Sequence, residues 1–359
     1  MAKTMKILAI NPGSTSTKIA LYEDDKELFK TNIEHSADEL AKYPNVASQY
    51  DMRKDAILAY LKSNNFDPST LDAIAARGGP IPYLKGGAYR VNDAMTAMLK
   101  SKEVPEHASN LAGLIAYEIT KPLGKNAYIY DAISADDFAD IARISGMPAL
   151  PRQSLCHVLN MRAVARKTAA EMGKPYSSLN LIVAHLGGGI TVSVHRDGKM
   201  EDIVSDDEGP FSPERAGRVP CRALIDLCYS GKYDFGTMKK MLRGKGGLVA
   251  YLGTSNCIEV EKRIDAGDAQ AKLILEAMAY QIAKSIGDLA TVVNGKVDAI
   301  VLTGGIAYSK LVTGWISDRV SFIAPVKLVP GENELESLAL GILRVLRGDE
   351  KANEYVVLK

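Results

Sequence analysis

The sequence predicts an α/β protein built from two similar lobes, and three observations predict it. Strand-like apolar runs alternate with helical patterns through the first half of the chain. A faint internal repeat places the same strand, glycine turn and strand in both halves. The chain has 359 residues, of which 47% are hydrophobic, and this is enough material for two hydrophobic cores.

The repeat lays residues 5–25 over residues 179–199 without a gap. In each copy an apolar run ends in a polar residue, Asn11 or His185, and a glycine-containing turn leads into a second β-prone run. Each copy therefore predicts a hairpin whose turn can contact a ligand.

The remaining elements follow from periodicity and from stop signals such as Gly173. Further strands are predicted over residues 71–79, 126–134 and 297–305. Helices are predicted over residues 50–64, 157–172, 268–293 and 335–346. A proline-bearing joint at 146–151 marks the domain boundary. We expect one domain at 1–150 together with a C-terminal helix at 346–359, and a second domain at 151–345.

Composition excludes several classes of function. Lys and Arg total 44 against 43 Asp and Glu, so a net charge of +1 gives no global attraction for nucleic acid or an anionic membrane. The four cysteines form no CxxC pair, which argues against a zinc or redox motif and favours a reducing compartment. No leader-like or membrane-spanning apolar run is evident. We expect a cytoplasmic protein that binds anions only at local sites.

The first turn, residues 11–18, is suited to a phosphate. Backbone N–H groups of such a turn point into one concavity, and Ser14, Ser16 and Lys18 can add hydrogen bonds or charge. It is not a Walker A motif, because the GxxxxGK[ST] spacing is absent and a strand follows. An ordinary hairpin turn is the alternative, and the repeat makes that alternative weaker.

Two other glycine clusters also end buried strands. Gly187, Gly188 and Gly189 have no side chains, so the phosphates of a nucleotide could approach the backbone closely. Gly304 and Gly305 precede Ile306, where a base could rest. Each cluster alone is more often a plain turn, but three together form a stronger pattern.

Motifs along nearly the whole chain resemble the acetate and butyrate kinase family, of the superfamily that also holds sugar kinases, Hsp70 and actin. They are INPGSTSTK, RGG at 77, EHASNLAG at 106, IYDAIS at 129, RQSLCHVLN at 152, HLGGG, DDEGPFSPERAG at 206, LTGGIA and PGENELESLALG at 330. EGPFSPERAG and PGENELESLALG are similar to the butyrate kinases in particular. The resemblance implies two ribonuclease-H-like lobes with a nucleotide cleft, ATP/ADP and Mg²⁺ as cofactors, and at least a dimer. It also implies a short-chain carboxylic acid as substrate and an acyl phosphate as product.

The resemblance also implies site residues. Asn11, Ser14 and Ser16 would lie at the transferring phosphate, Gly187 to Gly189 at the nucleotide phosphates, and Gly304 to Ile306 beside adenine. The residues implied around the reacting centre are Arg77, Asp131, His157, His185, Arg215 and Glu334.

Physical chemistry explains why these residue types are wanted. Charge on a transferring phosphoryl group needs neutralising, which suits Arg77 and Arg215. A carboxylate acceptor is already ionised at pH 7, so Asp131 is better interpreted as an orienting residue or metal partner than as a base. His157 and His185 can donate hydrogen bonds to phosphoryl oxygens. Glu334 suits Mg²⁺ held through water, and Glu332 is an alternative for that role.

Small residues at two positions predict the substrate's size. Acetate kinases resemble Arg-Val-Val and Phe-His where this chain has Arg77-Gly78-Gly79 and Cys156-His157. Gly79 and Cys156 would enlarge an acyl pocket, and each buried methylene is worth roughly 0.8 kcal/mol. We therefore expect a four- or five-carbon acid, straight or branched, with acetate or propionate as alternatives.

Two other functions stay open. An Hsp70-like or actin-like ATPase switch would have no evident need for a histidine and two arginines beside a water nucleophile. A sugar kinase would use a general base near the acceptor hydroxyl and polar groups to recognise the sugar. The direction of the reaction in the cell is also open, because an acyl phosphate can phosphorylate ADP.

Overall fold

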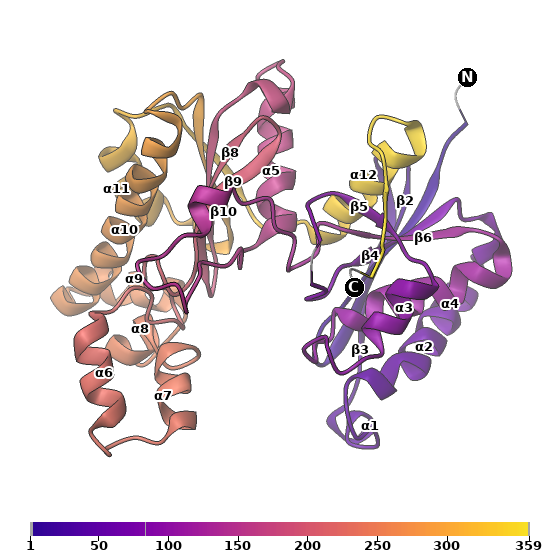
Figure 1. The fold of residues 1–359 in the computed structure, drawn as a ribbon, viewed down its shortest axis with the longest axis horizontal. Coiled ribbons are helices and arrows are strands. Elements are labelled where there is room, and N and C mark those ends of the chain that lie inside the picture. The colour runs from indigo at the N-terminus through magenta and orange to yellow at the C-terminus, as the bar shows by residue number, and fades with distance from the viewer. Residues whose placement is uncertain (1–2, 83, 358–359) are drawn as a thin grey trace. The chain divides into compact units, whose positions relative to one another are not determined.

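The computed structural model describes residues 3–82 and 84–357 (Figure 1). Contacts divide the chain into two compact units. The first unit is Met1–Asp136 with Asn333–Lys359, and the second unit is Asp137–Glu332. The predicted domain bounds at 150/151 and 345/346 remain a prediction, and the contact units change over at 136/137 and 332/333 instead.

The first unit contains a seven-stranded sheet in the order β12-β5-β6-β4-β1-β2-β3. Its strands are β1 (Lys6–Pro12), β2 (Ser16–Glu23), β3 (Lys26–Glu34), β4 (Ala73–Arg77), β5 (Ala88–Arg90), β6 (Asn126–Tyr130) and β12 (Asn353–Glu354). Its helices are α1 (Ala37–Leu40), α2 (Tyr50–Ser63), α3 (Asp93–Leu99), α4 (Asn110–Thr120) and α12 (Glu334–Arg347). Helices α2, α3 and α4 cover one face of the sheet, while α12 packs beside β1 and β4 on the other (Figure 1).

The second unit contains a five-stranded sheet in the order β11-β10-β7-β8-β9. Its strands are β7 (Leu181–Leu186), β8 (Ile190–Arg196), β9 (Lys199–Val204), β10 (Ala299–Gly304) and β11 (Val326–Pro330). Its helices are α5 (Val158–Glu171), α6 (Cys221–Tyr229), α7 (Phe235–Leu242), α8 (Gly247–Leu252), α9 (Cys257–Asp265), α10 (Ala269–Ala290) and α11 (Lys310–Val320). Helix α10 packs against β7, β8 and α11, and α5 packs against β7 and β10.

The internal repeat is a structural repeat. Strands β1 and β2 form an antiparallel hairpin, as do β7 and β8, and each hairpin continues antiparallel into a third strand. On its other side, β1 pairs parallel with β4, and β7 pairs parallel with β10. Strands β4, β7 and β10 are buried at every position. Their sequences are continuous apolar runs because both faces of each strand are covered. The repeat therefore puts the two glycine turns at equivalent corners of two sheets.

Most predicted elements are confirmed, but the C-terminal helix at 346–359 is wrong. Helix α12 ends at Arg347 because Gly348, with φ of 84°, caps it in the left-handed conformation. The chain then returns along β5 as the short parallel strand β12.

A buried imidazole predicts acid sensitivity of the fold. His195 on β8 is 0% exposed, with Nδ1 2.6 Å from Tyr176 Oη and Nε2 2.8 Å from Ser193 Oγ. Burial, together with the nearby charges of Arg162 and Arg166, lowers the pKa of His195 to about 3. The unfolded chain takes up this proton near pH 6.5, so stability is lost as pH falls from 6.5 toward 3.

We expect the free energy of unfolding to fall by about 2 kcal/mol more in the wild type than in His195→Gln between pH 6.5 and pH 5, since one proton is worth about 1.4 kcal/mol per pH unit. Urea unfolding at the two pH values measures this difference. Equal losses in both proteins would show that His195 does not carry the effect.

Candidate active site

A cavity of about 330 Å³ in the first unit gathers six of the predicted site residues. They are Asn11, Ser14, Ser16, Lys18, Arg77 and Glu334. The rest of the lining comes from Pro12, Gly13, Thr15, His107, Ser109 and Ile133. The lining is rich in hydroxyls, amide groups and cations, which is the chemistry that binds phosphate.

Sheet topology brings these residues together. Strands β1 and β4 run parallel, so the turn after Pro12 and the side chain of Arg77 lie at the same edge of the sheet. Helix α12 begins there with Glu334. Asn11 Nδ2 donates to Glu334 Oε2 at 2.5 Å, and Arg77 Nε lies 3.8 Å from Glu334 Oε1. The site thus holds an anionic oxygen donor beside a guanidinium.

Asp131 holds Arg77 and Gly87 in place through two hydrogen bonds. It is 1% exposed, has an unusual φ of 41°, and its Oδ1 accepts from the Gly87 N–H at 2.7 Å. Its carbonyl oxygen accepts from Arg77 Nη1 at 2.8 Å. A left-handed aspartate is a strained conformation that persists where surrounding contacts demand it. These contacts agree better with an orienting role for Asp131 than with a base.

Sequence reasoning missed His107 and Ser109. The ring nitrogen Nδ1 of His107 lies 2.6 Å from Ser109 Oγ, just before α4. Both residues belong to the EHASNLAG motif, but no strand end or glycine turn marked them as functional. Only the packing of α4 against β4 and β6 brings them to the cavity.

In the second unit, two predicted histidines are stacked. The rings of His157 and His185 have centroids 3.8 Å apart and lie 12° from parallel. Asn160 Nδ2 lies 2.9 Å from His185 Nδ1, and Glu332 Oε1 lies 3.0 Å from His185 Nε2. With the amide donating to Nδ1, the ring N–H is on Nε2 and faces the carboxylate. Glu332 is therefore engaged with a histidine, whereas Glu334 lies beside Asn11 and Arg77.

The glycine turn of the second unit accommodates Arg215. A Cβ at Gly189 would lie 2.3 Å from the Arg215 guanidinium carbon, so the absence of a side chain there admits the guanidinium. Arg215 Nη1 donates to Asp206 Oδ2 at 2.7 Å. Burial lowers the pKa of Arg215, and the Asp206 carboxylate opposes that effect. The structure thus places a cation directly against the turn that was predicted to bind phosphates.

Gly304 packs against the end of β7. It has φ of 88°, and a Cβ there would lie 2.4 Å from the Leu186 carbonyl oxygen. Gly305 is exposed and open, and Ile306 is 8% exposed in the following turn. The β10 turn is therefore adjacent to the start of the HLGGG turn.

Replacing Gly304 with alanine is expected to lower the free energy of unfolding by about 2 to 4 kcal/mol, from a strained φ and a backbone clash. Gly305→Ala is the control, because its φ is ordinary and, apart from its chain neighbours, no atom of the described residues lies within 4 Å of its added Cβ. We expect Gly305→Ala to stay within about 0.5 kcal/mol of the wild type. Urea unfolding of both variants measures the difference, and equal effects would contradict it.

The two positions predicted to size the acyl pocket differ in their surroundings. A Cβ at Gly79 would lie 1.8 Å from Asn110 Oδ1, so the space beside this glycine is filled by an amide. Asn110 Nδ2 donates to Pro105 O, while its Oδ1 has no hydrogen-bond partner among the described residues. Cys156 is half-buried just before α5. Chain-length preference remains a prediction.

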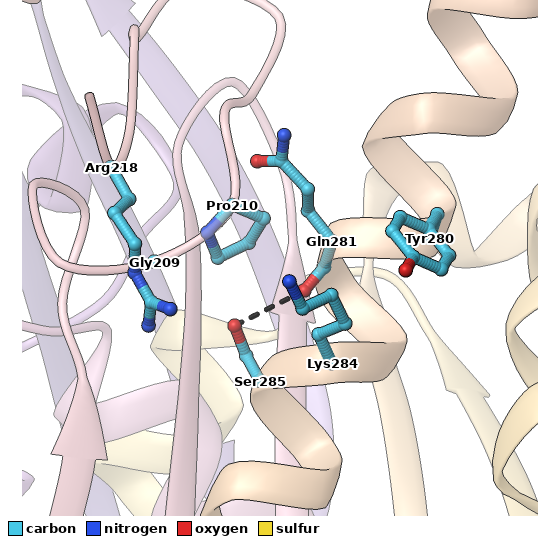
Figure 2. A pocket seen from close by; sticks show the side chains of 7 residues that line it. All are labelled: Gly209, Pro210, Arg218, Tyr280, Gln281, Lys284 and Ser285. Carbon is cyan, nitrogen blue, oxygen red and sulfur yellow. Dashed lines mark hydrogen bonds between the residues drawn. The ribbon is translucent and has the colours of Figure 1, made fainter. Parts of the chain in front are cut away.

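Another cavity, of about 160 Å³, lies in the second unit (Figure 2). Figure 2 shows Arg218 entering from one side, and Gln281, Lys284 and Ser285 entering from α10. Arg218 pairs with Asp288 at 3.4 Å. None of the predicted site residues lines this cavity.

Comparison with known proteins decides the family. The acetokinase family matches residues 152–318. Butyrate kinase 2 of Clostridium acetobutylicum is 50% identical over 352 residues, which cover 98% of this chain and 99% of that protein. The chain belongs to the acetokinase family. Solved structures agree with the fold of this chain, which confirms the predicted fold class of the actin, Hsp70 and sugar kinase type.

The acetate kinase of Porphyromonas gingivalis has a TM-score of 0.80 at 19% identity, covering 95% of this chain and 100% of that one. A propionate kinase of Francisella tularensis subsp. tularensis has a TM-score of 0.73 at 19% identity, covering 94% of this chain and 98% of that one. At these identities the likeness concerns the fold alone.

Within residues 3–82 and 84–357, the chain has no group of three or more His, Cys, Asp or Glu arranged to hold a metal. No disulfide joins any of the four cysteines within these described residues. In the same part of the chain, no helix combines the length and the apolar character needed to cross a membrane.

Proposed function

We propose that this protein transfers the γ-phosphoryl group of ATP to butyrate, giving butyryl phosphate and ADP, and that the reaction is reversible. A butyrate oxygen attacks the γ-phosphorus, and the bond from that phosphorus to the bridging oxygen breaks with its electron pair leaving on ADP. The observation that carries the proposal is the 50% identity to a butyrate kinase across 98% of the chain. The cationic, hydroxyl-rich cavity of the first unit supports it.

In this proposal the first unit holds the transferring phosphoryl group. Asn11, Ser14 and Ser16 donate hydrogen bonds to its oxygens, Lys18 adds charge, and Arg77 neutralises charge near the carboxylate. The conformation of Asp131 keeps Arg77 in position through its carbonyl oxygen. No general base is needed, since the acceptor is ionised at neutral pH.

In the same proposal the second unit binds the nucleotide. Gly187, Gly188 and Gly189 line its phosphates, and Gly304 to Ile306 border adenine. Arg215 supplies positive charge to the phosphates, and His157 and His185 supply N–H donors, His185 through Nε2. The contact between Arg215 and Gly189 supports this assignment.

Mg²⁺ fits the donor set around Glu334. Its carboxylate is 35% exposed and shares a cavity with the hydroxyls of Ser14 and Ser16, all of them hard oxygen donors. Because Mg²⁺ retains several waters and uses few carboxylates in phosphoryl-transfer sites, one glutamate is sufficient. When bound, the ion supplies charge neutralisation to the phosphates. A cytoplasmic location and assembly into at least a dimer complete the proposal.

A hydroxamate assay tests the function. ATP, Mg²⁺ and hydroxylamine are combined with acetate, propionate, butyrate, isobutyrate, valerate or glycerol, and kcat/KM is compared. We expect the highest kcat/KM on the four- and five-carbon acids. Highest activity on acetate or propionate would keep the reaction and reject the chain-length proposal. Slow ATP hydrolysis without acyl phosphate from any acid would instead favour an ATPase switch.

A further inference from the structure

Arg53 lies on α2, and its side chain is fully buried beneath the turn at residues 13–17. Its Nη1 donates to the carbonyl oxygens of Gly13 at 2.9 Å and Ser16 at 3.0 Å. Its Nη2 donates to the carbonyl oxygen of Ser14 at 3.0 Å. One guanidinium therefore holds three carbonyls of the turn that was predicted to bind phosphate.

The other donors of this guanidinium are satisfied by neutral groups as well. Gln49 Oε1 accepts from Nη2 at 2.9 Å and from Nε at 3.2 Å, and Thr17 Oγ1 lies 3.2 Å from Nη1. Burial lowers the pKa of Arg53, and Glu39 only partly opposes this without a hydrogen bond to it. A buried cation with neutral partners is costly, and apolar residues often fill such a space with greater stability. Stability alone therefore does not account for this arginine.

Peptide geometry says what the arrangement achieves. All peptide bonds of the described chain are trans, so each C=O points opposite to the N–H of the next residue. Turning the carbonyls of Gly13 and Ser14 toward Arg53 turns the N–H groups of Ser14 and Thr15 away from it. Both residues line the cavity, and neither N–H donates to a backbone acceptor in the described part of the chain. Two backbone donors of a turn that lines the cavity are thus left without a backbone acceptor, as in turns that bind anions.

We propose that Arg53 is a positioning residue for phosphoryl transfer, which fixes the 13–17 turn so that the Ser14 and Thr15 N–H groups face the transferring phosphoryl group. The inference rests on the proposed function of this turn. His35 supports the same turn. Its backbone N–H donates to Thr15 O at 2.9 Å, and its ring nitrogen Nε2 lies 2.9 Å from Thr17 Oγ1.

The corresponding turn of the second unit has a different support. There Ser212 Oγ donates to Gly188 O at 2.7 Å, and Glu214 N donates to the same oxygen at 3.4 Å. Neutral donors are sufficient for that turn. A guanidinium that donates to the carbonyls of the turn therefore lies beneath the first turn, whereas the guanidinium packed against the second turn, that of Arg215, donates to Asp206 instead.

The test is Arg53→Ala, assayed for hydroxamate formation with and without added guanidinium. We expect kcat/KM for ATP to fall by about 100-fold, because a small misplacement of a group at the reacting centre can cost that much in rate. KM for butyrate should change less than about 3-fold. Guanidinium at millimolar concentration should raise the kcat of Arg53→Ala by about tenfold or more, because it can refill the site that alanine empties. Arg53→Lys should recover little, since one ammonium cannot span three carbonyls.

Arg344→Ala is the matched control in the same unit. That guanidinium donates to Tyr130 Oη and Glu350 Oε2, away from the turn. Its loss should lower Tm without a guanidinium-dependent gain in kcat. If Arg53→Ala retains wild-type kcat/KM per folded molecule, or if guanidinium raises only its Tm, the proposal is overturned.

Two further readouts keep the proposal testable. Should Arg53→Ala fail to fold, Arg53→Lys and Gln49→Ala take its place, and wild-type turnover in both would overturn the inference. Hydrogen exchange of the backbone amides of residues 13–17 measures the order of the turn and does not depend on enzyme activity. Faster exchange there in the variant, with unchanged exchange at 187–189, supports the positioning role even if the wild type yields no hydroxamate, and unchanged exchange at both turns rejects it.

Discussion

Replacing Arg215 with alanine is expected to lower kcat for acyl phosphate formation by about 10³-fold or more, the range that arginines contribute to phosphoryl transfer. The guanidinium packs against Gly189 and is aligned by Asp206, so it is held where nucleotide phosphates are proposed to lie. Because the developing charge is greatest in the transition state, kcat should fall much more than KM for butyrate rises. Steady-state hydroxamate kinetics measure both constants.

Variants around Arg215 separate charge from position. Arg215→Lys keeps the charge without the forked donors and should recover only part of the rate. Gly189→Ala keeps the arginine but inserts a Cβ 2.3 Å from its guanidinium carbon, so it should displace the group and lower kcat with the fold retained. Arg218→Ala removes an exposed arginine paired with Asp288 and serves as the control. A similar loss in Arg218→Ala would mean that general charge, not Arg215, matters.

Replacing Glu334 with glutamine is expected to lower kcat by about 10² to 10³-fold and to raise the Mg²⁺ concentration needed for half-maximal activity. The carboxylate is the hard anionic donor of the first-unit cavity, and it accepts from Asn11 and faces Arg77. A neutral amide of the same shape binds Mg²⁺ more weakly and presents an N–H toward a guanidinium. Titration of activity with Mg²⁺ measures both effects.

Two neighbouring glutamates make the result specific. Glu336 shares the first turn of α12, so Glu336→Gln removes the same charge at the helix N-terminus without altering the cavity. Glu332 lies 3.0 Å from His185, and Glu332→Gln should affect turnover without changing the Mg²⁺ requirement. A raised Mg²⁺ requirement in Glu332→Gln alone would assign the metal to Glu332 instead.

Local sequence patterns were sufficient for the central strands, the longer helices and the two glycine turns. Continuous apolar runs predicted the buried strands β4, β7 and β10, because a strand covered on both faces has no polar side. The aligned repeat predicted two equivalent hairpins, since the same spacing of apolar and glycine residues specifies the same backbone. Strand ends then indicated Asn11, Arg77 and His185 as candidates.

The sequence by itself therefore determined the fold class, the repeat and the residues at strand ends. Only the tertiary structure decided which distant groups support them: Arg53 beneath the first turn, His107 beside the cavity, and Asn110 in the space next to Gly79. The physical reason is that sequence patterns report interactions between residues that are close in the chain. Periodicity and turn chemistry act between residues close in the chain, whereas a buried side chain and its partners meet only after the sheet and its helices have packed.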